Sequence, residues 1–350
     1  MTKPPRDIAA SVRQRLLDLA RKRDEDFQSV LTRYGLERFL YRLATSPHAD
    51  EFVLKGAMLF AVWTGEMHRA TWDVDLLGRG VPEAGRITKL FAGVCRASVE
   101  DDGLVFDEGS VRAERIREDL PYEGLRVRIA GRLGPARIRL QVDVGFGDAV
   151  RPPPRKLPLP TLLDLPAPVL RSYPREAVVA EKLNAMVTLG MVNSRMKDLY
   201  DLWTLAMRLP FEGRVLAAAV RATFNRRRTP LSADEPLALT DVFADDATKR
   251  VQWKAFVRRV RLRPDDPGLP AVVGVLRGFL LPPTRALAAG DTFHATWLAG
   301  GPWRKQRTPQ GRHSGAILAP EEGSRKRRPG LSAWCERGEL NPHTLAGTRS

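Results

Sequence analysis

Two carboxylates, Asp73 and Asp75, are separated by one residue in the segment WDVDLLG. The segment alternates in polarity and is closed by Gly78 and Gly80, which predicts a short strand. Residues two apart in a strand project from the same face, so both carboxylates would face one ion. Carboxylate oxygens are the ligands that Mg²⁺ prefers, and Mn²⁺ accepts the same set. The pair is therefore a candidate metal site, and the alternative is a solvated acidic turn.

A third carboxylate, Asp143, lies in the predicted strand ARIRLQVDVGFG. Its apolar residues project to one face and its polar residues, including Asp143, to the other. If this strand and the WDVDLLG strand are neighbours, three carboxylates converge. Such a cluster can hold metal ions between an attacking oxygen and the phosphates of a nucleotide.

Upstream of these strands, Lys55 and Gly56 lie between a predicted strand and an apolar helix. A glycine at such a turn lets backbone N–H groups approach a phosphate, which makes both residues candidates for nucleotide binding. The alternative is that Gly56 only relieves a tight turn.

Charged residues also recur in two later helical segments. Lys182 lies in the first, and Arg195, Lys197, Asp198 and Asp201 begin the second with spacings of three and four that share a helix face. The alternative is a salt-bridged helix surface, and Glu181 is assigned to that surface.

The composition bounds the class of protein. A chain of 350 residues with 43% hydrophobic residues can bury a core, and a net charge of +16 favours a polyanionic partner such as RNA. The alternative is a basic proteome with many surface arginines. Two distant cysteines indicate neither a disulfide framework nor a zinc site. No apolar run approaches the roughly 18 residues of a membrane span, so we expect a cytoplasmic protein without membrane contact.

The elements that must position these residues fall into five predicted segments. We expect N-terminal helices over 1–48, a mixed α/β domain over 49–150, a proline-rich linker over 151–170, a helical domain over 171–283, and a disordered tail over 284–350. Truncation after about Leu281 is accordingly expected to leave a folded protein.

Three motifs taken together resemble the AbiEii/AbiGii toxin family of the nucleotidyltransferase superfamily. They are FVLKGAMLFAVWTGEMHRATWDVDLLG, QVDVGFGD and YPREAVVAEKLNAMVTLGMVNSRMKDLYDLW, and the match covers about 52–281. The resemblance implies an α/β (α+β) fold in which a nucleotidyltransferase-like mixed-sheet domain with flanking helices precedes a helical domain. It also implies a nucleotide triphosphate as donor substrate, a separate antitoxin, and an RNA acceptor, because some relatives modify tRNA 3′ ends.

The resemblance also assigns roles by position. Its metal ligands are Asp73, Asp75 and Asp143, with Asp148 as an alternative to the last. Its phosphate-facing turn is Lys55–Gly56, and its catalytic residues are Lys182 and Asp198.

One departure from the family pattern favours a second interpretation. Ala57 and Met58 stand where the family turn carries a second glycine followed by Ser or Thr. A phosphate-contacting hydroxyl is therefore missing. The alternative function is a catalytically inactive module of this fold that binds nucleic acid or a partner protein.

Arginines also form clusters outside the candidate metal site. Candidate contacts to RNA phosphates are the arginines at 226–228, 258, 259, 261 and 263.

Overall fold

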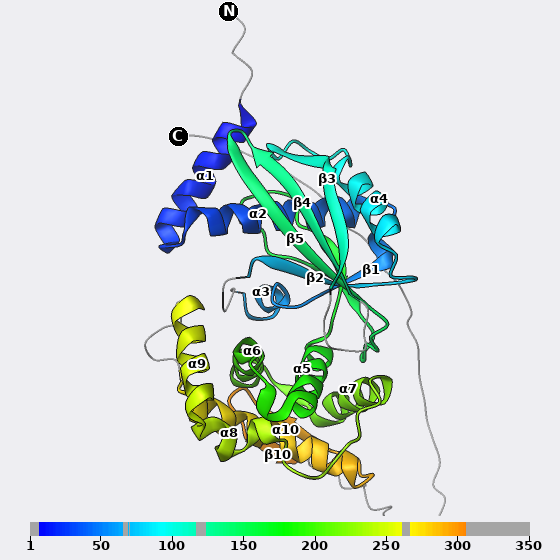
Figure 1. Cartoon of the computed structure of the whole chain (residues 1–350), viewed down its shortest axis with the longest axis vertical. Coiled ribbons are helices and arrows are strands. Elements are labelled where there is room, and N and C mark those ends of the chain that lie inside the picture. Colours follow the sequence, from blue (N-terminus) through cyan, green and yellow to red (C-terminus); the bar gives the residue numbers. More distant parts are fainter. Residues whose placement is uncertain (1–6, 66–68, 70, 117–123, 261–266, 306–350) are drawn as a thin grey trace, which may run out of the picture. The chain divides into compact units, whose positions relative to one another are not determined.

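The computed structural model describes residues 7–65, 69, 71–116, 124–260 and 267–305 (Figure 1). Its main sheet has seven strands in the order β3-β4-β5-β2-β1-β7-β6. The strands are β1 Phe52–Lys55, β2 Asp73–Gly78, β3 Leu104–Ile116, β4 Gly124–Leu133, β5 Ala136–Phe146, β6 Arg155–Pro158 and β7 Val169–Ser172. β2 pairs in parallel with β5, β1 pairs in parallel with β7, and the other neighbours are antiparallel. The mixed α/β class expected from the sequence is confirmed.

Helices accompany this sheet, and one of them packs closely against β5. A Cβ added at Gly35 in the middle of α2 would lie 2.9 Å from a methyl carbon of Ile138 on β5. A buried ion pair of 2.7 Å between Arg42 and Asp102 further ties α2 to the segment before β3. The helices are α1 Ile8–Arg23, α2 Phe27–Thr45, α3 Leu59–Thr64 and α4 Ala84–Cys95, with a 3₁₀ turn at Ala49–Glu51. The glycine therefore allows α2 to lie against the apolar side of β5.

Two parts of the proline-rich segment 151–170 belong to the sheet, although the sequence predicts a linker there. β6 lies within it and β7 begins in it, and Leu159 and Leu170 are buried. Proline cannot donate a ladder hydrogen bond and is tolerated on an edge strand, which is the position of β6 with its Pro158. Proline content therefore misidentified an edge strand as a linker.

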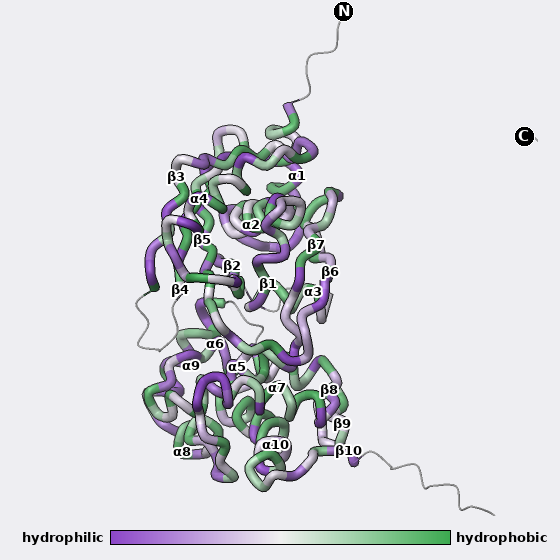
Figure 2. Tube along the Cα trace, turned by 90° about the vertical axis from the view of Figure 1, so that its right-hand side faces the viewer, coloured by the Kyte–Doolittle hydropathy of each residue, from purple (hydrophilic) through white to green (hydrophobic). Residues whose placement is uncertain are grey.

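Helices dominate the chain after β7, as the apolar spacing predicts. They are α5 Arg175–Leu189, α6 Met196–Arg208, α7 Gly213–Arg226, α8 Asp241–Asp245, α9 Ala247–Val260 and α10 Leu269–Ala288, with 3₁₀ turns at Gly190–Val192 and Leu237–Leu239. Much of α10 is hydrophobic in Figure 2. By length and composition alone α10 could cross a membrane, contrary to the expectation from the sequence, and half of its most apolar stretch is buried against the rest of the protein.

Regular structure continues beyond the predicted start of the tail at residue 284. α10 runs through Pro282 and Pro283 to Ala288, and β9 Ala295–Trp297 and β10 Trp303–Lys305 form a three-stranded sheet with β8 Phe211–Glu212. Residues 306–350 of the predicted tail lie outside the described residues.

This terminal segment satisfies carbonyl groups that two helices leave open. Pro283 has no N–H to donate to the carbonyl of Phe279 four residues earlier, and the indole N–H of Trp303 donates there instead at 2.9 Å. The indole N–H of Trp297 and the backbone N–H of Gly300 donate to Ala206 near the end of α6, at 2.7 and 3.0 Å. Residues 295–303 are therefore part of the packed structure.

Candidate active site

The strand register brings the predicted carboxylates together. Asp75 on β2 is paired with Asp143 on β5 and, on the other side, with Lys55 on β1. Asp73 lies two residues before Asp75 on the same face, and its carboxylate accepts a hydrogen bond of 3.1 Å from the Thr71 hydroxyl. The prediction that these two strands are neighbours is confirmed.

A cavity of about 230 Å³ covers this part of the sheet. Its lining includes Asp75, Asp143, Lys55 and Gly56 from the strands and their turn, and it also includes predicted residues from α5 and α6, namely Lys182 and Asp198. Asp73 is not among the lining residues. Residues from two distant parts of the sequence therefore meet at one cavity.

Gly56 is required at its position for two independent reasons. Its φ of +81° lies in the left-handed region, and an added Cβ would lie only 2.1 Å from Oδ2 of Asp75. The glycine therefore makes room for the Asp75 carboxylate.

Gly56→Ala is expected to reduce activity strongly, because the Asp75 carboxylate must move to admit the methyl group. Gly65→Ala is the matched control, since Gly65 has a similar φ of +78° but no atom within 4 Å of an added Cβ. Both variants should lose about 1 kcal/mol of stability from backbone strain. Measurement of activity and unfolding should show that only Gly56→Ala loses activity, and equal activities would contradict this role.

Lys55 is held by carboxylates of the protein. Its Nζ lies 2.9 Å from Asp148 and 3.6 Å from Glu181, and Arg227 contacts the same two carboxylates at 3.0 and 3.8 Å. Burial opposes the charged form of each group. The nearby carboxylates nevertheless raise the pKa of Lys55, and the charges of Lys55 and Arg227 lower the pKa of Asp148 to about 2. Asp148 is thus a partner of cations, which distinguishes it from Asp75.

Asp148→Asn is expected to lower the free energy of unfolding by about 2 kcal/mol at neutral pH. The folded pKa of about 2 lies below the ordinary 3.8, so this stabilisation is present above the ordinary pKa and lost as the pH falls toward 2. Denaturant titrations at about pH 7 and pH 3 should show the difference from wild type shrinking to about half. Asp164→Asn removes an exposed carboxylate that forms no ion pair with any described residue, and it should have little effect at either pH. A difference that does not change with pH would contradict the assignment.

Lys182 lies between two buried carboxylates of α6. Its Nζ donates to Asp198 at 2.5 Å and to Asp201 at 2.9 Å. Arg195 pairs with Asp198 at 2.7 Å, and Arg69 forms a two-bonded contact with Asp201 at 2.7 and 2.9 Å. Burial opposes ionisation of Lys182, but the two carboxylates raise its pKa. The spacing of these charges predicted a shared face; its two aspartates are buried, whereas Lys197 is exposed.

Several cavity residues were missed by the sequence reasoning. Glu181, assigned to a solvated surface, lines the same cavity as Lys182, and so do Arg69, Tyr173 and Arg227. Arg227 therefore does not belong to a surface arginine cluster as predicted. Arg261 and Arg263 lie outside the described residues. No spacing rule separates Arg227 from its neighbours Arg226 and Arg228, because a helix end can direct adjacent side chains to different surroundings.

Asp75 differs from the other cavity carboxylates in its environment. No described residue donates a hydrogen bond to it, while Asp143 accepts two from Arg126 at 2.9 and 2.8 Å. Burial, followed by the negative charge of Asp73, raises the pKa of Asp75 to about 6. Among the described residues, no three His, Cys, Asp or Glu side chains approach closely enough to enclose a metal ion. Mg²⁺ is commonly held by one or two carboxylates together with substrate phosphates, so the aspartates fit that mode of binding.

Comparison with known proteins bears on this site. Residues 38–276 match the family described as nucleotidyl transferase AbiEii toxin, type IV toxin–antitoxin system. No curated protein matches the sequence. Two Helicobacter pylori crystal structures are similar, each at 16% sequence identity. The first, a candidate nucleotidyltransferase, covers 77% of this chain and 100% of its own chain at a TM-score of 0.44. The second, JHP933, covers 76% of this chain and 95% of its own chain at a TM-score of 0.43. The family match spans more than half of the chain and contains the cavity residues described above. The chain therefore belongs to the nucleotidyl transferase AbiEii toxin family and is a nucleotidyltransferase.

Proposed function

We propose that this protein transfers a nucleoside monophosphate from a nucleoside triphosphate to an RNA acceptor, tRNA, with Mg²⁺ or Mn²⁺, as the toxin of a toxin–antitoxin pair. The observation that supports this most directly is the register Lys55–Asp75–Asp143 across three adjacent strands, at a cavity that Lys182 and Asp198 also line. In this arrangement the lysines would bind a polyphosphate and the carboxylates would bind a divalent metal within one cavity.

The aspartates would hold the metal. Asp75 provides a carboxylate without a hydrogen-bond donor among the described residues, Asp73 lies on the same strand face, and Asp143 lies across from Asp75. When bound, Mg²⁺ neutralises charge on the phosphates and favours release of pyrophosphate. Burial raises the pKa of Asp75 and the negative charge of Asp73 raises it further, so a bound cation would favour the ionised form of Asp75.

The lysines would offset the charge of the triphosphate. Lys55 and Lys182 both lie at the cavity, and neighbouring carboxylates raise the pKa of each, so both remain charged at neutral pH. Asp198, which is buried and bonded to Lys182, would fix the position of that ammonium group. This makes Asp198 a positioning residue for Lys182.

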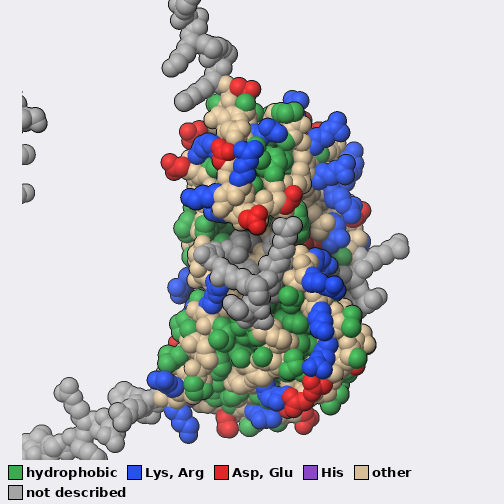
Figure 3. All heavy atoms as spheres, turned by 90° about the vertical axis from the view of Figure 1, so that its left-hand side faces the viewer, with side chains coloured by type: hydrophobic (Ala, Val, Ile, Leu, Met, Phe, Trp, Pro, Cys, Tyr) green, Lys and Arg blue, Asp and Glu red, His purple; other side chains and the backbone are tan. Residues whose placement is uncertain are grey.

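The charge distribution supports a polyanionic acceptor. Among the described residues that line the cavity, six are cationic and five are acidic, so the surplus of +16 resides mainly elsewhere. Figure 3 shows Lys and Arg side chains gathered along one side of the displayed face. A field spread over the surface attracts a long polyanion, whereas a small acceptor needs only a local patch. An acidic antitoxin would be attracted by the same field.

The test is incubation of the purified protein with Mg²⁺, each labelled nucleoside triphosphate in turn, and total tRNA. We expect label on tRNA, at its 3′ end, and its loss when EDTA is added. Label confined to the protein would exclude RNA as the acceptor. Absence of any label, together with retained RNA binding, would favour the inactive binding module.

A further inference from the structure

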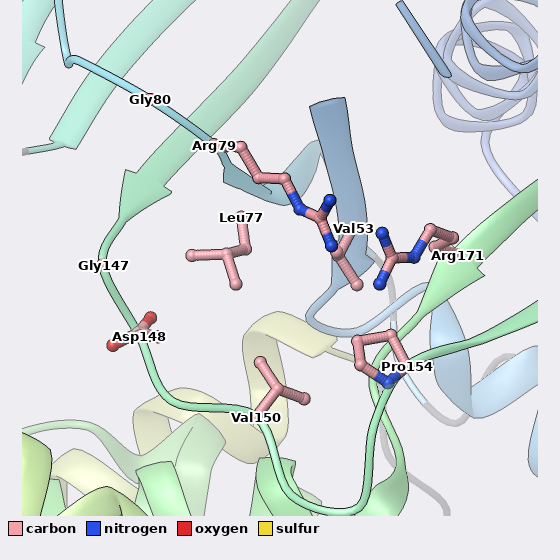
Figure 4. A pocket seen from close by; sticks show the side chains of 10 residues that line it. Val53, Leu77, Arg79, Gly80, Gly147, Asp148, Val150, Pro154 and Arg171 are labelled. Carbon is pink, nitrogen blue, oxygen red and sulfur yellow. The ribbon is translucent and has the colours of Figure 1, made fainter. Parts of the chain in front are cut away.

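A second cavity lies beside the candidate active site. It has a volume of about 390 Å³, and its lining includes Val53 from β1, Leu77 from β2, Arg171 from β7, and Arg79, which follows β2 (Figure 4). Asp148 lines this cavity and the active-site cavity alike. The two cavities therefore share a wall.

Strand register places this cavity on the same sheet face as the metal-ligand candidates. Leu77 lies two residues beyond Asp75 and is paired with Val53, just as Asp75 is paired with Lys55. Arg79 lies two residues beyond Leu77, after the end of the strand. A step of two residues along a strand is about 6.6 Å, so the second cavity begins one such step from the carboxylates. Arg79 itself lies two such steps from Asp75, about 13 Å along the strand direction, a separation that a short stretch of one nucleic-acid strand can span.

The two arginines at this cavity have no partner of opposite charge within the described part of the chain. No described carboxylate forms an ion pair with the side chain of Arg79 or Arg171, and no described group accepts a hydrogen bond from either side chain. Asp148, the acidic residue of the lining, is already bound by Lys55 and Arg227. In Figure 4 the guanidinium groups of Arg79 and Arg171 point toward one another. Two like charges in this arrangement repel, and an anion between them would replace repulsion with two attractions.

The chemistry of the guanidinium group indicates which class of ligand this cavity would bind. Its planar set of N–H donors matches the oxygens of a phosphate, and two such groups can bind one phosphate from two sides. Arg226, which is not part of the lining, donates through Nε to the carbonyl of Gly147, which is. The apolar floor of Val53 and Leu77 supplies no donor or acceptor side chain for a base edge. The two guanidinium groups are therefore the side-chain donors that this lining offers to a phosphate.

We propose that Arg79 and Arg171 bind a backbone phosphate of the RNA acceptor and so hold the acceptor strand beside the active site. This inference rests on the proposed function, because it requires RNA as the acceptor. The site fixes the position of the strand without reading its sequence.

The test compares three proteins: wild type, the double variant Arg79→Gln/Arg171→Gln, and the matched control Arg15→Gln/Arg208→Gln. The control removes two exposed arginines, on α1 and at the end of α6, that form no ion pair with any described residue. Binding of 5′-dye-labelled total tRNA is measured by fluorescence anisotropy at several salt concentrations, and binding of each nucleoside triphosphate by calorimetry. Labelling of tRNA is followed in parallel.

We expect the double variant to bind tRNA at least about tenfold more weakly, with a salt slope reduced by about one phosphate contact, and to bind nucleotide as wild type does. The control variant should retain wild-type tRNA affinity. Equal tRNA affinity of the double variant and wild type would overturn the site while leaving the proposed function intact. A loss of nucleotide affinity with unchanged tRNA affinity would also overturn it, because the pocket would then serve the donor. If wild type neither binds nor labels tRNA, the proposed acceptor and the site fail together.

Discussion

Asp75→Asn is expected to reduce nucleotidyl transfer by at least about a hundredfold, because an amide keeps the volume of the carboxylate but removes the charge that a divalent metal requires. The same variant is expected to be more stable than wild type in the absence of metal. The pKa of Asp75 is raised from 3.8 to about 6 in the folded protein, so its ionised form destabilises the fold above that pH. The asparagine removes this penalty, which amounts to about 1–3 kcal/mol.

This combination separates a catalytic role from a structural one. Transfer of label to tRNA and chemical denaturation in EDTA are measured on the same preparation. Asp291→Asn, which changes an exposed carboxylate after α10, should alter neither quantity. An Asp75→Asn protein that retained full activity would exclude this aspartate as a metal ligand. One that lost activity together with stability would show that the carboxylate supports the fold.

The second large effect is expected at Trp297. Its side chain is 4% exposed, its indole N–H donates to Ala206 at the end of α6, and its ring lies 5.0 Å from that of Phe279 on α10. Trp297→Ala should therefore lower the free energy of unfolding by about 3–5 kcal/mol, a large part of the total stability of a typical domain. Truncation after Leu281, which the sequence predicts to be harmless, should cost more, since it also removes the indole N–H that Trp303 donates to Phe279.

Denaturant titration of the Trp297→Ala and Leu298→Ala variants tests whether Trp297 stabilises the fold. Leu298 is the next residue and is exposed, so its truncation should change stability by less than about 0.5 kcal/mol. Similar stabilities of the two variants, or a cooperative unfolding transition of wild-type midpoint in a chain ending at Leu281, would show that residues 282–305 contribute little to the fold.

The sequence predicted the strand-borne part of the site because strand geometry is simple. Side chains alternate, so the parity of Asp75 and Asp143 relative to their apolar neighbours fixed the face to which each projects. The site residues on helices were harder to predict. Apolar residues surround much of α5, and no single polar face separates Lys182 from Glu181, so the two adjacent residues were assigned different surroundings although both line the cavity.

The errors in the C-terminal part have a different physical origin. The sequence predicted a disordered tail from residue 284, directly after Pro282 and Pro283, each of which lacks an N–H donor. The helix continues because Pro283, Thr284 and Leu287 are buried, and because the Trp303 indole donates to the carbonyl of Phe279 from 24 residues away. A long-range contact of this kind has no local signature. The segment from Trp297 to Trp303 contains glycines and a proline and has no regular spacing of apolar residues, so it resembles a disordered tail when only periodicity is considered.

Asp148 has a consequence for how the two substrates would be bound. Its carboxylate lines both cavities and is bound by Lys55 and Arg227, which belong to the cavity of the proposed donor nucleotide. A ligand in either cavity that draws one of these cations away, or displaces the carboxylate, changes the free energy of binding in the other. By thermodynamic reciprocity the factor is the same in both directions. The affinity for the donor nucleotide would then differ in the presence and absence of the acceptor, and the affinity for the acceptor would differ likewise. The ratio of the two affinities would measure the cooperativity that arises from the shared Asp148.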